Sequence, residues 1–211
     1  MKSAETVYVV DDDPGVLKAL TRLLQASGYS VAAFLSPLAF LDGHDPVAPG
    51  CLVLDVAMPE LNGLELQRRL VLSGSDRAIV FISGQGDIPM SVGAMKAGAI
   101  DFLPKPFDDA QLLAAIGTAI EKNRALSESR ARKQAVARRL ATLTLREREV
   151  LELVVSGQLN KHIANQLGTV EKTIKVHRAR VMRKMGAASL ADLVRMAERA
   201  GIGSASRPSG N

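Results

Sequence analysis

The sequence is poor in cysteine and in aromatic side chains, and both shortages exclude classes of protein. The 211 residues contain one cysteine, Cys51, no tryptophan, and only 3% aromatic residues. A single thiol rules out an internal disulfide framework and gives no support to a cysteine-built zinc site. Stacking platforms for single-stranded nucleic acid need several aromatic rings, which this chain does not supply. We therefore expect a protein of a reducing compartment, with a cytoplasmic location.

Long uncharged runs are missing as well. No stretch approaches the roughly 18 uncharged residues of a transmembrane helix, and the N-terminal residues lack the layout of a signal peptide. We therefore expect no membrane partner. Apolar residues make up 47% of the chain, which is enough to bury a core. The length is large for one compact domain and comfortable for two, at roughly 100–150 residues each.

The charge is divided unevenly along the chain. Residues 1–125 carry 10 Lys and Arg against 15 Asp and Glu, whereas residues 126–211 carry 17 against 7. An acidic first part and a basic second part indicate two domains with different partners. The basic part is the one expected to contact a polyanion.

The first part alternates strand-like and helix-like segments. Strands are predicted at residues 6–10, 30–35, 51–55, 78–83 and 99–103, and a segment with apolar residues at helical spacing follows each of them. This order is typical of an α/β fold with a doubly wound, five-stranded parallel sheet. Such sheets collect their functional groups at the carboxyl ends of the strands.

Charged and polar side chains stand where these strands end. Six such residues end or follow a strand: Asp11, Asp12, Asp13, Asp55, Ser83 and Lys105. Carboxylates share a few ångströms only when a cation or a proton separates them. Oxygen ligands suit Mg²⁺, and a lysine beside a hydroxyl group suits a phosphoryl group. The set predicts phosphoryl transfer onto Asp55 as the nucleophile. For Asp13, a helix-capping role is the preferred interpretation.

Over residues 5–124 the chain resembles the bacterial response-regulator receiver domains, whose fold is flavodoxin-like or CheY-like, and in particular their FixJ-like branch. The resemblance rests on three segments: VVDDDPGV, LVLDVAMPELNGLEL and VFISGQGDIPMSVGAMKAGAIDFLPKPF. It implies that Asp55 takes a phosphoryl group from a sensor histidine kinase, with Mg²⁺ or Mn²⁺ as cofactor. The metal ligands it implies are Asp12, Asp55, the carbonyl of Ala57 and, through water, Asp11. The switch residues it implies are Ser83, Phe102 and the phosphoryl-binding Lys105. The Lys105–Pro106 peptide is expected to be cis.

The second part has a purely helical pattern. Residues 125–141 are polar and basic and are expected to form a partly helical linker. Four short helices are expected within residues 142–201, with glycine stops at 157, 168, 186 and 201. Thr144 and Glu147 have the spacing of a capping box. The small and polar residues 202–211 are predicted to be a disordered tail.

The third of these helices has one apolar face and six cations: Lys172, Lys175, Arg178, Arg180, Arg183 and Lys184. Such a helix fits the major groove of B-DNA, although composition alone supports a solvated basic helix or a membrane-surface helix equally well. Over residues 142–201 the chain resembles the LuxR/NarL-type helix-turn-helix domain. The resemblance implies a scaffold helix at 161–167 and a recognition helix at 171–185. By this resemblance Lys175 and Val176 face the groove, and phosphate contacts are expected from Lys161, Lys172, His177 and Arg180.

These patterns together predict a two-component transcriptional response regulator, with a receiver domain followed by a small all-α domain. Phosphorylation of Asp55 by a sensor histidine kinase is expected to repack the face of the fourth helix and fifth strand. Homodimerisation would then promote specific binding to double-stranded DNA, with activation through RNA polymerase favoured over repression. We expect no enzymatic activity beyond phosphoacceptance and dephosphorylation at Asp55.

Two alternatives stay open. One is a DNA-binding regulator with an inert receiver, and the other is a Mg²⁺-dependent phosphohydrolase. A response of DNA binding to a phosphoryl donor separates the first from our prediction, and turnover of small phosphate esters separates the second.

Overall fold

The computed structural model describes residues 5–46, 48–84 and 88–202. The chain divides into two compact units, with the boundary between Glu128 and Ser129. Apart from Ile202, the predicted tail at 202–211 lies outside the described residues. Within the described ranges, no helix is both long enough and apolar enough to cross a membrane.

The first unit contains a parallel sheet of five strands, as the sequence predicts. The strands are β1 (Thr6–Val10), β2 (Ser30–Phe34), β3 (Gly50–Asp55), β4 (Ala78–Ser83) and β5 (Asp101–Pro104). Their order in the sheet is β2-β1-β3-β4-β5, and every neighbouring pair is parallel. Every residue of β3 and β4 is buried. The carboxyl ends of β1 and β3 therefore lie side by side near the middle of the sheet.

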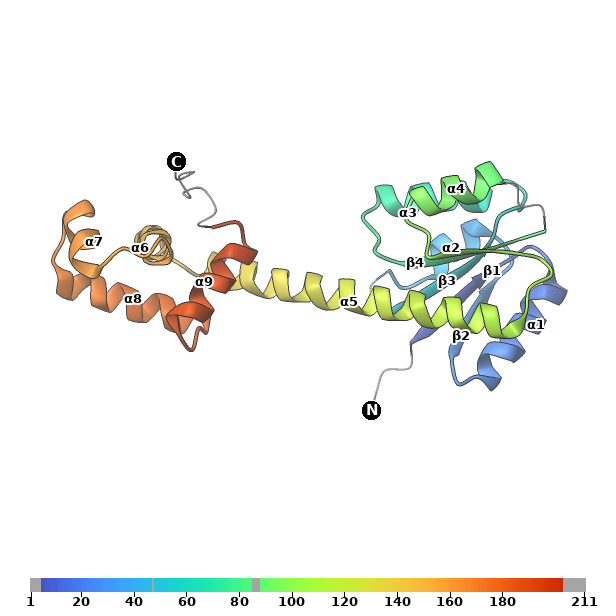
Figure 1. Cartoon of the computed structure of the whole chain (residues 1–211), viewed down its shortest axis with the longest axis horizontal. Coiled ribbons are helices and arrows are strands. Elements are labelled where there is room, and N and C mark those ends of the chain that lie inside the picture. Colours follow the sequence, from blue (N-terminus) through green and yellow to red (C-terminus); the bar gives the residue numbers. More distant parts are fainter. Residues whose placement is uncertain (1–4, 47, 85–87, 203–211) are drawn as a thin grey trace. The chain divides into compact units, whose positions relative to one another are not determined.

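Helices cover both faces of this sheet (Figure 1). They are α1 (Pro14–Ala26), α2 (Pro37–Gly43), α3 (Gly63–Leu72), α4 (Ile88–Lys96) and α5 (Asp109–Ala141). On one face α1 and α5 pack their apolar stripes, including Leu24 and Ile116, against the strands. On the other face Phe40 of α2, Leu66 of α3 and Ala94 of α4 do the same. The doubly wound arrangement predicted from the sequence is confirmed.

Helix α5 is a single helix of 33 residues that runs through the whole segment predicted as a linker. Ala, Arg, Lys, Gln, Glu and Leu dominate this segment, and all of them are strong helix formers. Its first half places Leu112 and Ile116 in the core of the first unit. Its last turns place Val136 and Leu140 in the core of the second unit. One helix thus contributes to both cores.

The second unit adds four helices to the end of α5: α6 (Leu145–Val155), α7 (Asn160–Gln166), α8 (Glu171–Met185) and α9 (Leu190–Arg199). A capping box begins α6, with Thr144 and Glu147 each bonding to the backbone of the other. At the start of α8, Val170 makes no side-chain cap bond. The core of the unit is entirely aliphatic, because all seven aromatic residues of the chain lie within residues 1–125.

Candidate functional site

The carboxyl ends of the strands bring three charged side chains together. Asp11 follows β1, Asp55 ends β3 and Lys105 follows β5. The Nζ atom of Lys105 donates to Oδ2 of Asp11 at 2.7 Å and to Oδ1 of Asp55 at 2.8 Å. Lys105 comes 94 positions after Asp11 and 50 positions after Asp55 in the chain, and the three side chains form one ion-pair network. The convergence predicted for these three residues is present.

Local backbone geometry holds each of these groups in place. Asp13 caps α1 by accepting from the amides of Gly15 and Val16, as predicted for it, and its own amide donates to Oδ1 of Asp11 at 2.9 Å. The Lys105–Pro106 peptide is cis, and the amide of Lys105 donates to the carbonyl of Ser83 at 2.7 Å. The cluster is therefore fixed through the strands and not through flexible side chains alone.

Glycine at position 63 allows α3 to begin directly against the end of β3. A Cβ atom at this position would lie 2.3 Å from the carbonyl oxygen of Asp55. The amide of Gly63 donates to the carbonyl of Val56 at 3.0 Å. No larger residue fits without moving the backbone that carries Asp55.

Burial and charge set the electrostatics of the cluster. Asp11 and Asp55 are only 1% and 4% exposed. Burial raises the pKa of Asp11, in spite of its hydrogen bond from Lys105. Burial also acts to lower the pKa of Lys105, but its bonds to the two carboxylates outweigh this effect and the pKa is raised. Two carboxylates against one ammonium leave this network with a net negative charge, which favours a further cation.

The donor set fits Mg²⁺ in its chemistry. Two carboxylates point toward the same ammonium, and oxygen ligands of this kind suit that ion. Among the residues that the structure describes, no three Asp, Glu, His or Cys side chains gather into a ready-made metal site. Asp12 is exposed, and the amide of Ala57 donates to Oδ2 of Asp55 at 2.7 Å. Lys105, and not a third acid, links Asp11 to Asp55.

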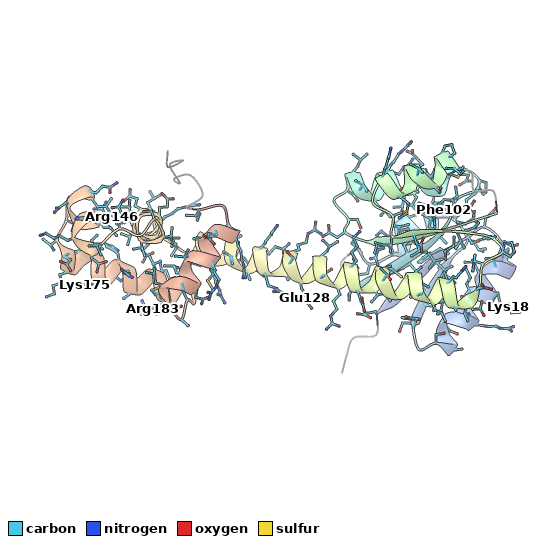
Figure 2. All side chains as sticks on the ribbon, in the orientation of Figure 1. Lys18, Phe102, Glu128, Arg146, Lys175 and Arg183 are labelled. Carbon is cyan, nitrogen blue, oxygen red and sulfur yellow. The ribbon has the colours of Figure 1, made fainter. Side chains whose placement is uncertain are left out.

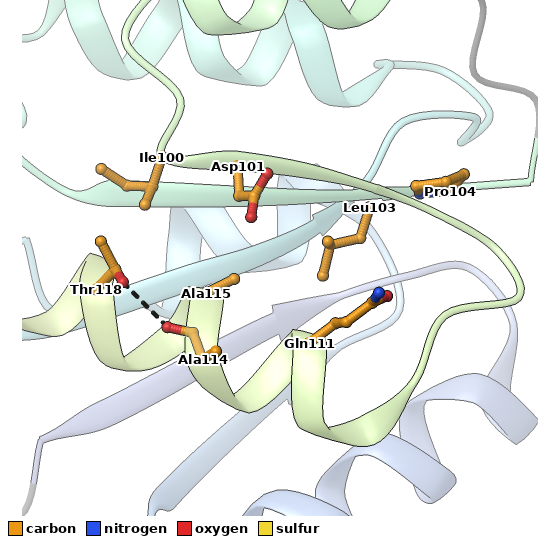
Figure 3. A pocket seen from close by; sticks show the side chains of 8 residues that line it. All are labelled: Ile100, Asp101, Leu103, Pro104, Gln111, Ala114, Ala115 and Thr118. Carbon is orange, nitrogen blue, oxygen red and sulfur yellow. Dashed lines mark hydrogen bonds between the residues drawn. The ribbon is translucent and has the colours of Figure 1, made fainter.

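The predicted switch residues Ser83 and Phe102 lie on β4 and β5. Ser83 ends β4 and is 1% exposed. Phe102 of β5, labelled in Figure 2, is half-buried, and its ring centroid lies 6.1 Å from that of Phe81. A groove of about 520 Å³ runs between β5 and α5, with Asp101, Leu103 and Gln111 among its lining residues (Figure 3). Strand β5 therefore contacts Phe81 of β4 through Phe102 and lines a groove together with α5.

In the second unit, five of the six predicted DNA-contacting side chains are exposed: Lys161, Lys172, Lys175, Val176 and Arg180. Figure 2 labels Lys175 and Arg183, whose side chains extend outward from α8. Lys175 forms an ion pair with Glu171 at 3.0 Å. The sixth side chain, His177, is half-buried, and its buried Nδ1 atom has no hydrogen-bond partner among the residues that the structure describes.

Two of the six cations of α8 bond to other segments of the second unit, which the sequence pattern does not reveal. The Nζ atom of Lys184 donates to Oε2 of Glu147 at 2.5 Å and to the carbonyl of Thr142 at 2.9 Å. Arg178 donates to Oδ1 of Asn160 at 3.2 Å. No local spacing signals these contacts, because the partners lie 18 to 42 residues away. The cationic face of α8 is therefore smaller than its composition suggests.

Comparison with known proteins covers nearly the whole chain. Residues 7–117 match the family described as the response regulator receiver domain, and residues 141–197 match the luxR family of bacterial regulatory proteins. The transcriptional regulatory protein FixJ of Azorhizobium caulinodans is 45% identical over 202 residues, which cover 96% of each chain. The response regulator protein TmoT of Ectopseudomonas mendocina is 47% identical over 92% of this chain and 88% of its own.

Two solved structures are also similar over most of the chain. A low-resolution structure of the response regulator StyR has a TM-score of 0.87 at 44% identity, over 93% of this chain and all of the other. A crystal structure of full-length FixJ from B. japonicum has a TM-score of 0.56 at 44% identity, over 93% of this chain and 97% of the other.

Proposed function

This chain belongs to the two-component response regulators that join a receiver domain to a LuxR-type DNA-binding domain, and from that premise we propose that Asp55 is its phosphoacceptor. In this proposal a sensor histidine kinase supplies the phosphoryl group, and the modified receiver promotes dimerisation and specific DNA binding. The observation that carries it is the double hydrogen bond of Lys105 to Asp11 and Asp55. A strand-end carboxylate beside a fixed cation suits the capture of a phosphoryl group.

Receiver domains generally bind Mg²⁺ for phosphorylation, and the acidic cluster of this chain fits that ion. Asp55, Asp12 and the carbonyl of Ala57 would hold it directly, and Asp11 through a water molecule. The ion would neutralise the negative charge that gathers on the transferred phosphoryl oxygens. Lys105 would stay beside Asp55 and bind the phosphoryl group as a point charge.

Phosphorylation replaces the single negative charge of the Asp55 carboxylate by an acyl phosphate with a charge of roughly −1.5 to −2. We expect the hydroxyl group of Ser83 to move toward that charge and the half-buried ring of Phe102 to turn inward. Both residues stand at β4 and β5, so this repacking reaches the face formed by α4 and β5. Phosphorylation of Asp55 would thereby change the shape of the surface formed by α4 and β5.

The α4–β5 surface suits a second copy of this chain. Ile88, Val92 and Met95 form an exposed apolar stripe at helical spacing on α4, and Ile88 is 79% exposed. Exposed apolar stripes of this kind mark interaction surfaces. A two-fold dimer would present two copies of α8 to a two-fold-related DNA site, where the exposed Lys175 and Val176 would read bases. RNA polymerase is the partner expected for transcription activation.

A DNA-binding measurement with and without a phosphoryl donor tests the proposal. We expect the donor and Mg²⁺ together to raise the affinity of the full chain for a duplex selected from a random pool by about 10- to 100-fold. Asp55→Asn cannot form the acyl phosphate and should show no gain. Asp45→Asn, in the loop between α2 and the amino end of β3, is the matched control and should keep it. Equal affinity under all conditions would leave a constitutive DNA-binding protein with an inert receiver.

A charge placed on the α4 stripe should prevent dimerisation. We expect Val92→Glu to weaken dimerisation of the phosphorylated chain by at least about 10-fold, because burying an unpaired carboxylate in an apolar interface is costly. Leu38→Glu changes an exposed apolar residue of α2 and should have no effect. Sedimentation velocity of both phosphorylated variants provides the measurement. A Val92→Glu chain that dimerises like the wild type would place the dimer interface elsewhere.

A further inference from the structure

Hydrogen bonds connect the carboxyl end of α8 to the carboxyl end of α5. Arg139, near the end of α5, donates from Nη1 to the backbone carbonyl of Met185 at 2.8 Å. Conversely, Lys184 of α8 donates from Nζ to the carbonyl of Thr142, which directly follows α5. The same Lys184 reaches Glu147 at the start of α6. We call these five residues the α8 clasp.

Arg139 supplies a hydrogen-bond donor to the carboxyl end of α8. The last carbonyls of an α-helix have no partner within the helix and carry a partial negative charge. Gly186 ends α8 in the left-handed conformation, with φ 63°. A Cβ atom there would lie 3.2 Å from Nη1 and 3.3 Å from Cζ of Arg139. The absence of a side chain at Gly186 therefore leaves room for the guanidinium group over the helix end.

Packing beneath the clasp joins the same two helices. Val136 and Leu140 of α5 are buried in one cluster with Val181 and Met185 of α8. Met185 thus lies in the core through its side chain and accepts from Arg139 through its carbonyl. The last turns of α5 and the last turns of α8 are therefore held together by apolar contacts and by directed hydrogen bonds.

We propose that Arg139 is a positioning residue for DNA binding, which fixes the orientation of α8 relative to the end of α5. This inference rests on the proposed role of α8 as the recognition helix. Base readout needs the exposed side chains of α8 at defined places in the groove, whereas phosphate attraction needs only their charge. Loss of the Arg139 bond should consequently lower the affinity for specific DNA more than the affinity for non-specific DNA.

The preceding residue provides a matched control. Arg138 is an exposed arginine on the same helix, so that Arg138→Met and Arg139→Met remove the same charge one position apart. Any effect of net charge on phosphate attraction is then common to both variants. Arg139→Gln removes the charge and keeps an N–H donor, on a side chain two bonds shorter than that of arginine. It separates the positioning bond from the charge.

The experiment measures the affinity of the full, phosphorylated chain for a selected duplex and for a scrambled duplex at fixed salt. We expect Arg138→Met to lower both affinities by a similar factor of about 2 to 3. Arg139→Met should lower the ratio of specific to non-specific affinity about 10-fold more than Arg138→Met does. Arg139→Gln, whose donor reaches less far, should restore part of that ratio.

Two further measurements keep the proposal falsifiable. Amide hydrogen exchange of α6 and α7 checks that the second unit of Arg139→Met is folded. If that unit is not folded, Arg139→Lys replaces Arg139→Met in the experiment, because lysine keeps the charge and an N–H donor group. We expect Arg139→Lys to lower the ratio of specific to non-specific affinity about 3-fold. Equal ratios for the Arg138 and Arg139 variants would overturn the proposal. A Lys175→Ala chain with unchanged affinity for the selected duplex would instead refute the proposed role of α8.

Discussion

Replacing Lys105 by methionine is expected to disconnect DNA binding from phosphorylation and to destabilise the first unit. Lys105 is the cation that bridges two carboxylates which are almost fully buried. Removing one partner of a buried ion pair leaves its charges uncompensated. Since the Lys105 side chain is itself 26% exposed, we expect a loss of roughly 2–3 kcal/mol, below the usual range for such pairs.

The same substitution removes the group expected to hold the phosphoryl oxygens. Donor treatment should then raise the DNA affinity of Lys105→Met less than about 3-fold, against the 10- to 100-fold expected for the wild type. Incorporation of the phosphoryl group at Asp55 is measured separately, by mass spectrometry of the intact chain. A normal gain in DNA affinity in the phosphorylated Lys105→Met chain would show that Lys105 has only a structural role.

The double variant Lys105→Met/Asp11→Asn separates stability from switching. Replacing Asp11 with an amide removes the repulsion between the two carboxylates, so we expect most of the lost stability to return. The response of DNA binding to the donor should stay below about 3-fold, because the ammonium group of Lys105 no longer faces the phosphoryl group. The near-ultraviolet signal of Tyr8 and Tyr29 reports unfolding of the first unit alone, since the second unit has no aromatic residue.

The first unit could be predicted from its sequence almost completely, and for an identifiable reason. Strands buried on both faces give continuous apolar runs such as those ending at Asp55 and Ser83, and these runs are hard to confuse with surface segments. Parallel order then places their carboxyl ends at one edge. The cluster of Asp11, Asp55 and Lys105 follows from topology, without any knowledge of side-chain packing.

The second unit was less predictable, because its decisive contacts join residues far apart in the sequence. A helical wheel assigns Lys184 to the cationic surface of α8, yet this side chain turns back to Glu147. The sequence likewise gives no sign that the segment predicted as a linker contributes Val136 and Leu140 to a core. Its high helix propensity was visible, but a propensity does not say which residues a helix will pack against.

The contact between Glu147 and Lys184 is expected to make the second unit sensitive to acid. Glu147 is 3% exposed, and the hydrogen bond from Lys184 lowers its pKa to about 2, with the amide of Thr144 acting in the same direction. A carboxyl group whose pKa is lower in the folded state than in the unfolded state stabilises the fold when it is ionised. This stabilisation is complete above about pH 4.5 and disappears as the pH falls toward 2.

Glu147→Gln tests this assignment, because the amide cannot ionise. At neutral pH we expect the second unit to lose roughly 1 kcal/mol, the difference between a charged and a neutral hydrogen bond, or roughly 4–8 °C in its midpoint of unfolding. Between pH 4.5 and 2 the second unit of the wild type should lose its additional stability, while the stability of the variant should stay nearly constant. Amide hydrogen exchange in α6 and α8 of the full chain measures both effects.

Glu152→Gln is the matched control on the same helix. Glu152 is exposed and lies 4.0 Å from Arg148 in a surface pair, which contributes less than about 0.5 kcal/mol. Its replacement should leave both the stability and the pH profile unchanged. If Glu147→Gln behaved like Glu152→Gln, the carboxylate of Glu147 would contribute nothing to the second unit. Since Lys184 belongs to α8 and Glu147 to α6, a confirmed effect would mean that acid weakens the contact between these two helices.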